Sequence, residues 1–171
     1  MTISPDLGDF SLDEIRSALD DVRHPFEVAV YGSENYHNMG SIVRTCHSFL
    51  CAKIWQIDFG DFYKRATMGT HKFETIEPLT LAEFLTATID RNIVVLERNP
   101  DLQMQDIRGF HYPDRPILFF GSEKFGVPAQ VIEVAENIVT IPMYGLHNDL
   151  NLAVAAGIAI YDFVSKLKKY G

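Results

Sequence analysis

Three segments of the sequence combine polar side chains and glycines at spacings that could support chemistry. The first runs from Asn38 through Gly40 to Arg44 and follows a short apolar stretch. An asparagine can cap a helix, a glycine lets another backbone approach closely, and an arginine near a helix N-terminus favours a phosphate group. Taken alone, this segment could bind a phosphate. The pattern is, however, more typical of an ordinary capped helix with a surface arginine.

The second and third segments join apolar stretches to glycine-containing loops. In residues 119–128, Gly121 and Gly126 flank Glu123, without the spacing of a P-loop or a dinucleotide-binding turn. This loop could hold an adenosine-sized ligand through backbone groups, or it could be a tight turn. Residues 141–151 lead into a stretch rich in Ala and Ile. A helix with so little polarity is buried against the sheet, another subunit, or both.

The elements that must position these segments alternate between strand and helix. Ser11 and Glu14 form a capping-box pattern, which predicts a short amphipathic helix that ends before Pro25. Strands are expected at 26–32, 53–59, 93–97, 116–121 and 138–142, and helices at 38–50, 81–90, 129–136 and 150–168. This alternation predicts an α/β fold, a mostly parallel sheet with helices on both faces. Ligands bind such sheets at the carboxyl ends of the strands, where the three segments lie.

Composition excludes several classes of protein. The chain has 171 residues, 47% hydrophobic and 22% charged, which fits one domain with its own core rather than a disordered chain. The apolar stretch 150–161 is too short to cross a bilayer, so we expect a soluble, cytoplasmic protein without membrane partners. We expect Cys46 and Cys51 to be reduced and to lie on different faces of one helix. The histidines lack metal-ligand spacing, so no metal is expected.

The net charge of −8 argues at first against a nucleic acid partner. However, residues 1–21 contain six acidic residues and one basic residue, and so account for −5 of this charge. Residues 41–72 contain two acidic residues and five basic ones, which are Arg44, Lys53, Lys64, Arg65 and Lys72. From composition alone, a solvated loop with incidental charge is still favoured for this region over a surface that binds nucleic acid.

Taken together and in order, the three segments resemble the SpoU (TrmH-like) branch of the SPOUT RNA methyltransferases. The residues that carry the resemblance are Asn38, Gly40, Ile42, Arg44 and Thr45; Phe120, Gly121, Ser122, Glu123 and Gly126; and Ile141, Pro142, Met143, Gly145, Leu150 and Asn151. The resemblance divides the chain into an acidic N-terminal helix (1–25) and a methyltransferase domain (26–171). It implies a C-terminal trefoil knot, a homodimer, and transfer of a methyl group from S-adenosylmethionine to a ribose 2′-hydroxyl of tRNA or rRNA.

The resemblance also implies roles for individual residues. Arg44, Asn38 and Asn151 would be catalytic, with Arg44 acting together with a phosphate of the RNA. The cofactor would be held by Leu96, Gly121, Glu123, Ile141, Met143, Asp149 and Leu150. The RNA would be bound by Arg44, Lys64, Arg65 and Lys72.

The chain departs from the family pattern in the third segment. Serine is common in the family at the position of Asp149, and a small hydroxyl residue is also missing at Ala153. Together with the negative net charge, these departures leave an alternative function open, that of a catalytically inactive, RNA-binding knotted dimer. A weaker alternative is an α/β domain that binds another adenosine-like ligand without contacting RNA.

Overall fold

The computed structural model describes residues 10–32, 36–146 and 149–167. In these residues seven strands form one parallel sheet in the order β3-β2-β1-β6-β4-β7-β5. The strands are β1 (Glu27–Tyr31), β2 (Lys53–Ile57), β3 (Ile76–Leu79), β4 (Ile93–Leu96), β5 (Gln105–Asp106), β6 (Ile117–Phe120) and β7 (Asn137–Thr140). The predicted α/β fold is confirmed, whereas the trefoil knot stays a prediction.

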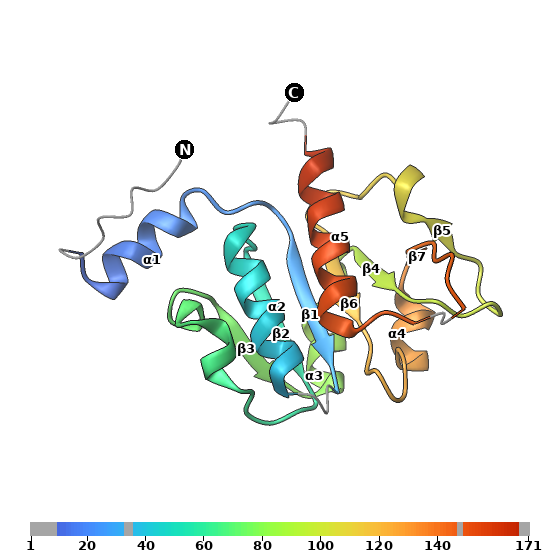
Figure 1. Cartoon of the computed structure of the whole chain (residues 1–171), viewed down its shortest axis with the longest axis horizontal. Helices are drawn as coiled ribbons and strands as arrows, with labels where there is room; N and C mark the ends of the chain where they lie inside the picture. The colour runs from blue at the N-terminus through green and yellow to red at the C-terminus, as the bar shows by residue number, and fades with distance from the viewer. Residues whose placement is uncertain (1–9, 33–35, 147–148, 168–171) are drawn as a thin grey trace.

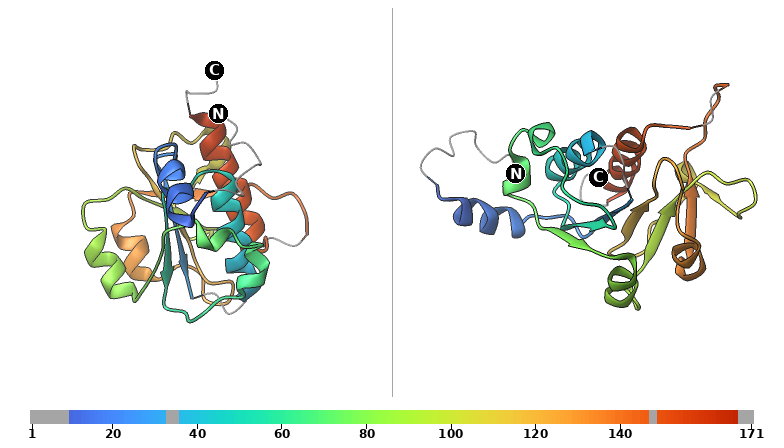
Figure 2. Two further views of the ribbon diagram at one scale, coloured as in Figure 1. Left: turned by 90° about the vertical axis from the view of Figure 1, so that its left-hand side faces the viewer. Right: turned by 90° about the horizontal axis from the view of Figure 1, so that it is seen from below.

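Helices cover both faces of this sheet. The helices are α1 (Leu12–Asp20), α2 (Tyr36–Ser48), α3 (Leu81–Ala87), α4 (Ala129–Val134) and α5 (Leu152–Lys166). Helices α2 and α5 lie on one face and α3 and α4 on the other (Figures 1 and 2). Along β1, Val28 and Val30 pack into the cluster under α2 and α5, while Ala29 packs into the cluster above α3 and α4. Burial on both faces explains why the central strands are continuously apolar.

Two strands, β3 and β5, were not predicted from the sequence. Both lie at edges of the sheet, β3 beside β2 and β5 beside β7. Strand β3 contains Glu77 and Pro78, both exposed, and β5 is only two residues long. Proline is tolerated at a sheet edge because one side of the strand needs no hydrogen-bond partner. Short, half-exposed strands of this kind lack the apolar pattern on which the prediction depended.

The N-terminal helix α1 begins as predicted. Ser11 Oγ accepts a hydrogen bond from the Glu14 backbone N–H, and Glu14 Oε2 accepts one from the Ser11 N–H. These bonds to Ser11 lower the pKa of Glu14. Of the residues in α1 only Leu19 is buried, and Figure 1 shows the helix set apart from the two helical layers. Within the described residues, no helix is both long and apolar enough to cross a membrane.

Two local expectations at α2 were wrong. Asn38 does not cap the helix, because α2 already begins at Tyr36 and Asn38 lies buried in its first turn. Cys51 is not helical, because α2 ends at Ser48 and Leu50 adopts a left-handed conformation that turns the chain towards β2. Cys46 and Cys51 are both buried and unpaired, and burial raises the pKa of the Cys46 thiol.

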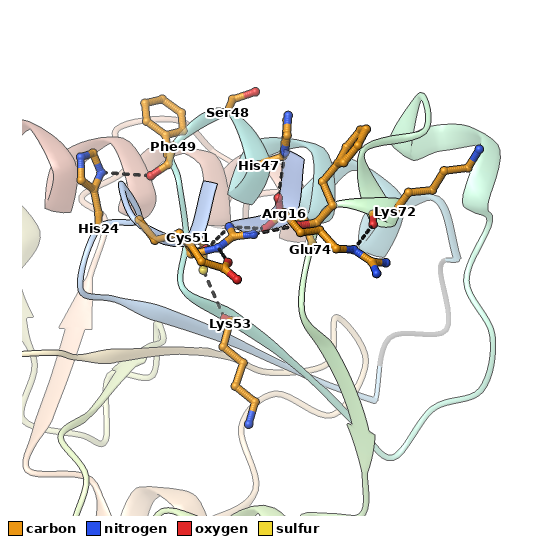
Figure 3. A network of polar contacts seen from close by, with 12 residues as sticks. Arg16, His24, His47, Ser48, Phe49, Cys51, Lys53, Lys72 and Glu74 are labelled. Carbon is orange, nitrogen blue, oxygen red and sulfur yellow. Dashed lines mark hydrogen bonds and ion pairs between the residues drawn. The ribbon is translucent and has the colours of Figure 1, made fainter. Parts of the chain in front are cut away.

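A buried ionic network joins α1, α2 and the start of β3. Arg23 Nη1 donates to Glu74 Oε2 over 2.9 Å and to the Cys51 carbonyl over 2.6 Å, and its Nε donates to Asp20 Oδ1. The second Glu74 oxygen lies 2.8 Å from His47 Nδ1 (Figure 3). Burial alone would lower the pKa of Arg23, but its bonds to the two carboxylates raise it. The network therefore fixes the segment that leads into β3 against α2.

Candidate functional site

A cavity of about 230 Å³ opens at the carboxyl edge of the sheet. It is bounded by the ends of β4, β6 and β7, by the loops that follow them, and by the start of α5. All seven residues expected to hold a cofactor line this cavity, namely Leu96, Gly121, Glu123, Ile141, Met143, Asp149 and Leu150. The structure thus brings together residues that are 54 positions apart in the chain, because parallel strands end at a common edge.

The wall contributed by residues 121–126 is built mainly from backbone. The Ser122 N–H donates to the Gly126 carbonyl over 3.0 Å, and the Gly126 N–H donates back to the Ser122 carbonyl over 2.8 Å. A Cβ on Gly121 would stand 2.4 Å from the Gly126 carbonyl carbon. A side chain at position 121 would therefore push the loop away, so glycine is required for this closure.

A chain of hydrogen bonds connects the cavity to the first turn of α2. Asn151 Nδ2 donates to Asn38 Oδ1 over 3.0 Å and to Glu123 Oε1 over 3.1 Å. Asn151 Oδ1 accepts from the backbone N–H groups of Ala153 and Val154, and so caps α5. Both donors of the Asn151 amide and both acceptor positions of its oxygen are occupied. Asn151 can therefore order the site, but it has no hydrogen-bonding capacity left for a substrate.

Asn38 differs from Asn151 in having an unused donor. Its side chain is buried, and its Nδ2 makes no hydrogen bond within the described residues. A buried amide donor without a partner is costly, by roughly 1–3 kcal/mol. The adjoining Asn38–Asn151 bond holds the amide oxygen, so the nitrogen is the group of this amide that has no partner among the described residues.

Arg44 lies six residues further along α2 and is exposed. It does not line the cavity, and within the described residues no hydrogen bond or ion pair joins its guanidinium to another group. The structure therefore brings Asn38 and Asn151 together but leaves Arg44 on the surface of α2, available to a ligand that extends beyond the cavity.

The predicted RNA-binding residues Lys64, Arg65 and Lys72 are exposed on two short 3₁₀ helices, η1 (Lys64–Thr67) and η2 (Thr70–Lys72). Both pack against α2. A Cβ on Gly40 would stand 2.6 Å from Ala66 Cβ, which confirms that this glycine permits a close approach.

The charge of this surface comes from its lysines and arginines. Burial and the nearby charges of Lys64 and Lys72 lower the pKa of His71, so the imidazole is neutral at pH 7. Lys53 was counted with the basic residues, but it pairs with Glu77 and lies over the Trp55 ring. It is therefore not part of the free basic surface.

Among the lining residues that the sequence analysis did not place in the site, two are charged, Glu97 and Arg98. Both directly follow β4, and a charged pair immediately after a buried parallel strand was the available signal. The three carboxylates of the lining, Glu97, Glu123 and Asp149, suit a ligand that carries positive charge.

The profile of the SpoU rRNA Methylase family matches residues 25–161, which is most of the chain. The chain belongs to this family. It is 26% identical over 156 residues to a tRNA (guanosine(18)-2′-O)-methyltransferase of Aquifex aeolicus, a match that covers 88% of this chain and 74% of the relative. It is 33% identical over 132 residues to a 23S rRNA (adenosine(1067)-2′-O)-methyltransferase of Streptomyces laurentii, covering 72% of this chain but 48% of that relative.

Solved structures of SpoU proteins have the same fold. The A. aeolicus TrmH/SpoU tRNA modifying enzyme superposes with a TM-score of 0.80 at 26% identity, over 94% of this chain and 84% of that one. An AdoMet-bound rRNA methyltransferase from Sinorhizobium meliloti gives a TM-score of 0.76 at 25% identity, over 87% of this chain and 60% of that one. The cofactor expected from the sequence is thus the one bound by a structural neighbour.

The described residues fit S-adenosylmethionine on their own chemistry. The cavity has apolar walls for an adenine ring, backbone groups of the 121–126 loop, and carboxylates that attract a sulfonium. Glu123, in the lining of the cavity, is linked through Asn151 to the buried Asn38 amide, whose Nδ2 makes no hydrogen bond within the described residues.

Proposed function

We propose that this protein is an S-adenosylmethionine-dependent methyltransferase that acts on a ribose 2′-hydroxyl of tRNA or rRNA, as a homodimer in the cytoplasm. The observation that carries the proposal is the cavity at the carboxyl edge of the sheet, joined through Glu123 and Asn151 to the unpartnered amide of Asn38. The names of the relatives support both classes of RNA. A tRNA or rRNA substrate is compatible with the proposed cytoplasmic location.

The residues suggest a division of labour in the reaction. When bound, S-adenosylmethionine supplies an electrophilic methyl group. A ribose hydroxyl is a very weak acid, so its proton must pass to another group as the oxygen attacks. An arginine is a poor proton acceptor, so Arg44 binds an RNA phosphate, and this phosphate takes the proton. Asn38 Nδ2 donates to an oxygen of the substrate, while Asn151 and Glu123 position Asn38.

The exposed basic residues provide the surface for the RNA. Lys64, Arg65 and Lys72 lie on segments that pack against α2, the helix that carries Arg44. Few phosphate contacts give weak binding with a shallow salt dependence. A substrate that needs more contacts is better held by two copies of the chain than by one.

The homodimer is supported by an exposed apolar face on α5. Val154, Ile158 and Tyr161 follow one stripe of the helix and are 50%, 38% and 64% exposed. The small residues Ala156 and Ala159 are buried on the opposite side, against the sheet. An exposed apolar stripe continuous with the start of the site suits a second copy of this chain.

The decisive experiment replaces Arg44. We expect Arg44→Ala to reduce methyl transfer at least about 100-fold, because the group that binds the proton-accepting phosphate is lost. The measurement is transfer of labelled methyl groups to total RNA from cells without this gene, with 2′-O-methyl sites mapped afterwards. Arg115→Ala is the control, because Arg115 is also exposed but lies before β6, at the other edge of the sheet.

Two results would contradict the proposal. Methylation by Arg44→Ala at the parent rate would remove Arg44 from the mechanism. If calorimetry found no binding of S-adenosylmethionine to the parent protein, the inactive RNA-binding dimer would be the better description.

A further inference from the structure

Glu97 occupies a position in the cavity that the proposed mechanism does not use. It directly follows β4, and its backbone N–H donates to the Val139 carbonyl over 3.0 Å, so the pairing of β4 with β7 continues through this residue. Its side chain is partly buried and lines the cavity between Leu96 and Arg98. The carboxylate is thus held on the sheet rather than on a loose loop.

The Glu97 carboxylate ties the second loop of the site to this strand end. Its Oε2 accepts a hydrogen bond from the Val127 N–H over 3.2 Å and lies 3.2 Å from where a Cβ on Gly126 would stand. Its Oε1 accepts from the Arg98 N–H over 2.7 Å. An ionised carboxylate can accept about four hydrogen bonds, so each oxygen keeps one acceptor position.

The other two carboxylates of the lining are placed differently. Glu123 Oε1 already accepts from Asn151 Nδ2 and from the Leu152 N–H, at the end of the cavity near α2. Asp149 is exposed at the mouth. Among the described lining residues, Glu97 is therefore the carboxylate that is partly buried and still has acceptor capacity.

We propose that Glu97 recognises the ribose of the nucleoside cofactor by accepting hydrogen bonds from its 2′- and 3′-hydroxyls. Two neighbouring hydroxyl donors match the two oxygens of one carboxylate, and α/β folds place ribose-binding acids at strand ends. Because the same carboxylate bonds the Val127 N–H, ribose binding also holds the 122–127 loop closed over the cavity. The inference rests on the proposed cofactor site.

Calorimetry with S-adenosylhomocysteine and its 2′-deoxy and 3′-deoxy analogues tests the proposal. This ligand has the same ribose but no sulfonium, so attraction of the carboxylates to a sulfonium does not enter the comparison. We expect the parent to lose about 10- to 100-fold in affinity when a hydroxyl is removed, as for a hydrogen bond to a charged group. In Glu97→Ala, removal of the same hydroxyl is expected to cost less than about 3-fold.

Glu97→Gln separates recognition from loop anchoring. The glutamine keeps an acceptor for the Val127 N–H but has no charge, so we expect hydroxyl removal to cost it less than it costs the parent. If Glu97→Ala binds S-adenosylhomocysteine too weakly to measure, Glu97→Gln can be compared with the parent instead. Glu133→Ala, an exposed carboxylate on α4 outside the cavity, is expected to match the parent with all three ligands.

The possible failures can be told apart. If Glu97 only anchored the loop, Glu97→Ala would weaken all three ligands by one factor and Glu97→Gln would weaken them less, while hydroxyl removal would cost the same as in the parent. That result would overturn the role of Glu97 and leave the cofactor site intact. If the parent bound none of the three ligands, the cofactor site itself would be wrong, and the assignment of Glu97 with it.

Discussion

Asn38 and Asn151 carry the same amide group, but the fold gives them different roles. Every donor and acceptor position of the Asn151 amide is occupied by Asn38, Glu123 or the first turn of α5. Asn38 keeps one buried donor that no described residue satisfies. The resemblance implies that both are catalytic. The hydrogen bonds of Asn151 suit a positioning role, and contact of Asn38 with substrate stays a prediction.

Gly121→Ala tests the backbone-built wall of the cavity. The added Cβ would stand 2.4–2.6 Å from the Gly126 carbonyl group and the Val127 nitrogen, so the 122–127 loop must move. We expect the affinity for S-adenosylhomocysteine to fall at least about 10-fold, because misplaced backbone groups lose their hydrogen bonds to the ligand. Calorimetry measures the affinity, and thermal unfolding shows whether the variant folds.

Gly109→Ala is the matched control for this substitution. A Cβ at Gly109 would meet no atom within 4 Å, so affinity and stability should match the parent. A Gly121→Ala variant with parental affinity would mean that the 122–127 loop does not form the ligand site.

Among the residues of the site, those that directly follow a strand were the ones whose place could be predicted from the sequence. The seven cofactor residues that the resemblance implies converge because the carboxyl ends of parallel strands meet at one edge. The hydrogen bonds of Asn151 depend on the angle between α2 and α5, which no sequence pattern specifies. Glu97 was missed because a carboxylate after a strand is unremarkable until the loop at Val127 closes on it.

At the scale of elements, the central strands and the helices were predicted to within a few residues. Strong apolar runs define β1, β4 and β6, and the capping boxes at Ser11 and Thr80 define the starts of α1 and α3. The edge strands β3 and β5 were not found. Their pairing is decided by tertiary contacts with β2 and β7 rather than by their own residues.

The network around Glu74 predicts how these elements are held together. The Glu74 and Arg23 side chains are 1% and 7% exposed, so removal of the Glu74 charge leaves the buried Arg23 with only the exposed Asp20 as its counter-ion. We expect Glu74→Gln to lower the free energy of unfolding by about 3 kcal/mol, measured by urea denaturation. The segment that carries Lys64 and Lys72 would lose its anchor to α2 at the same time.

Glu77→Gln is the control for this ion pair. Glu77 pairs with Lys53 but is 48% exposed, and surface pairs contribute less than about 1 kcal/mol. If Glu74→Gln and Glu77→Gln unfolded at the same urea concentration, the buried network would contribute no more to the free energy of unfolding than the surface pair does.

At the scale of the whole molecule, net charge is a poor guide to the partner. Much of the −8 comes from residues 1–21, which precede the sheet, while the exposed basic residues lie on segments packed against α2. A single copy offers few phosphate contacts, and its Arg44 does not line its own cavity. The proposed dimer would double the number of basic residues that a folded RNA can contact.

The apolar stripe of α5 provides the test of that assembly. Tyr161→Asp places a charge on an exposed position, so the monomer should fold normally, but burial of the unpaired carboxylate in an interface would be costly. We expect the parent to have about twice the chain mass of 19.4 kDa in light scattering, and Tyr161→Asp to have the mass of one chain. Ile89→Asp, at an 82% exposed apolar position after α3, should remain dimeric.

A parent with the mass of one chain would exclude the dimer, and a dimeric Tyr161→Asp would move the interface away from α5. If the substitution abolishes both the dimer and methyl transfer while calorimetry shows unchanged binding of S-adenosylhomocysteine, then the second copy serves the RNA and not the cofactor.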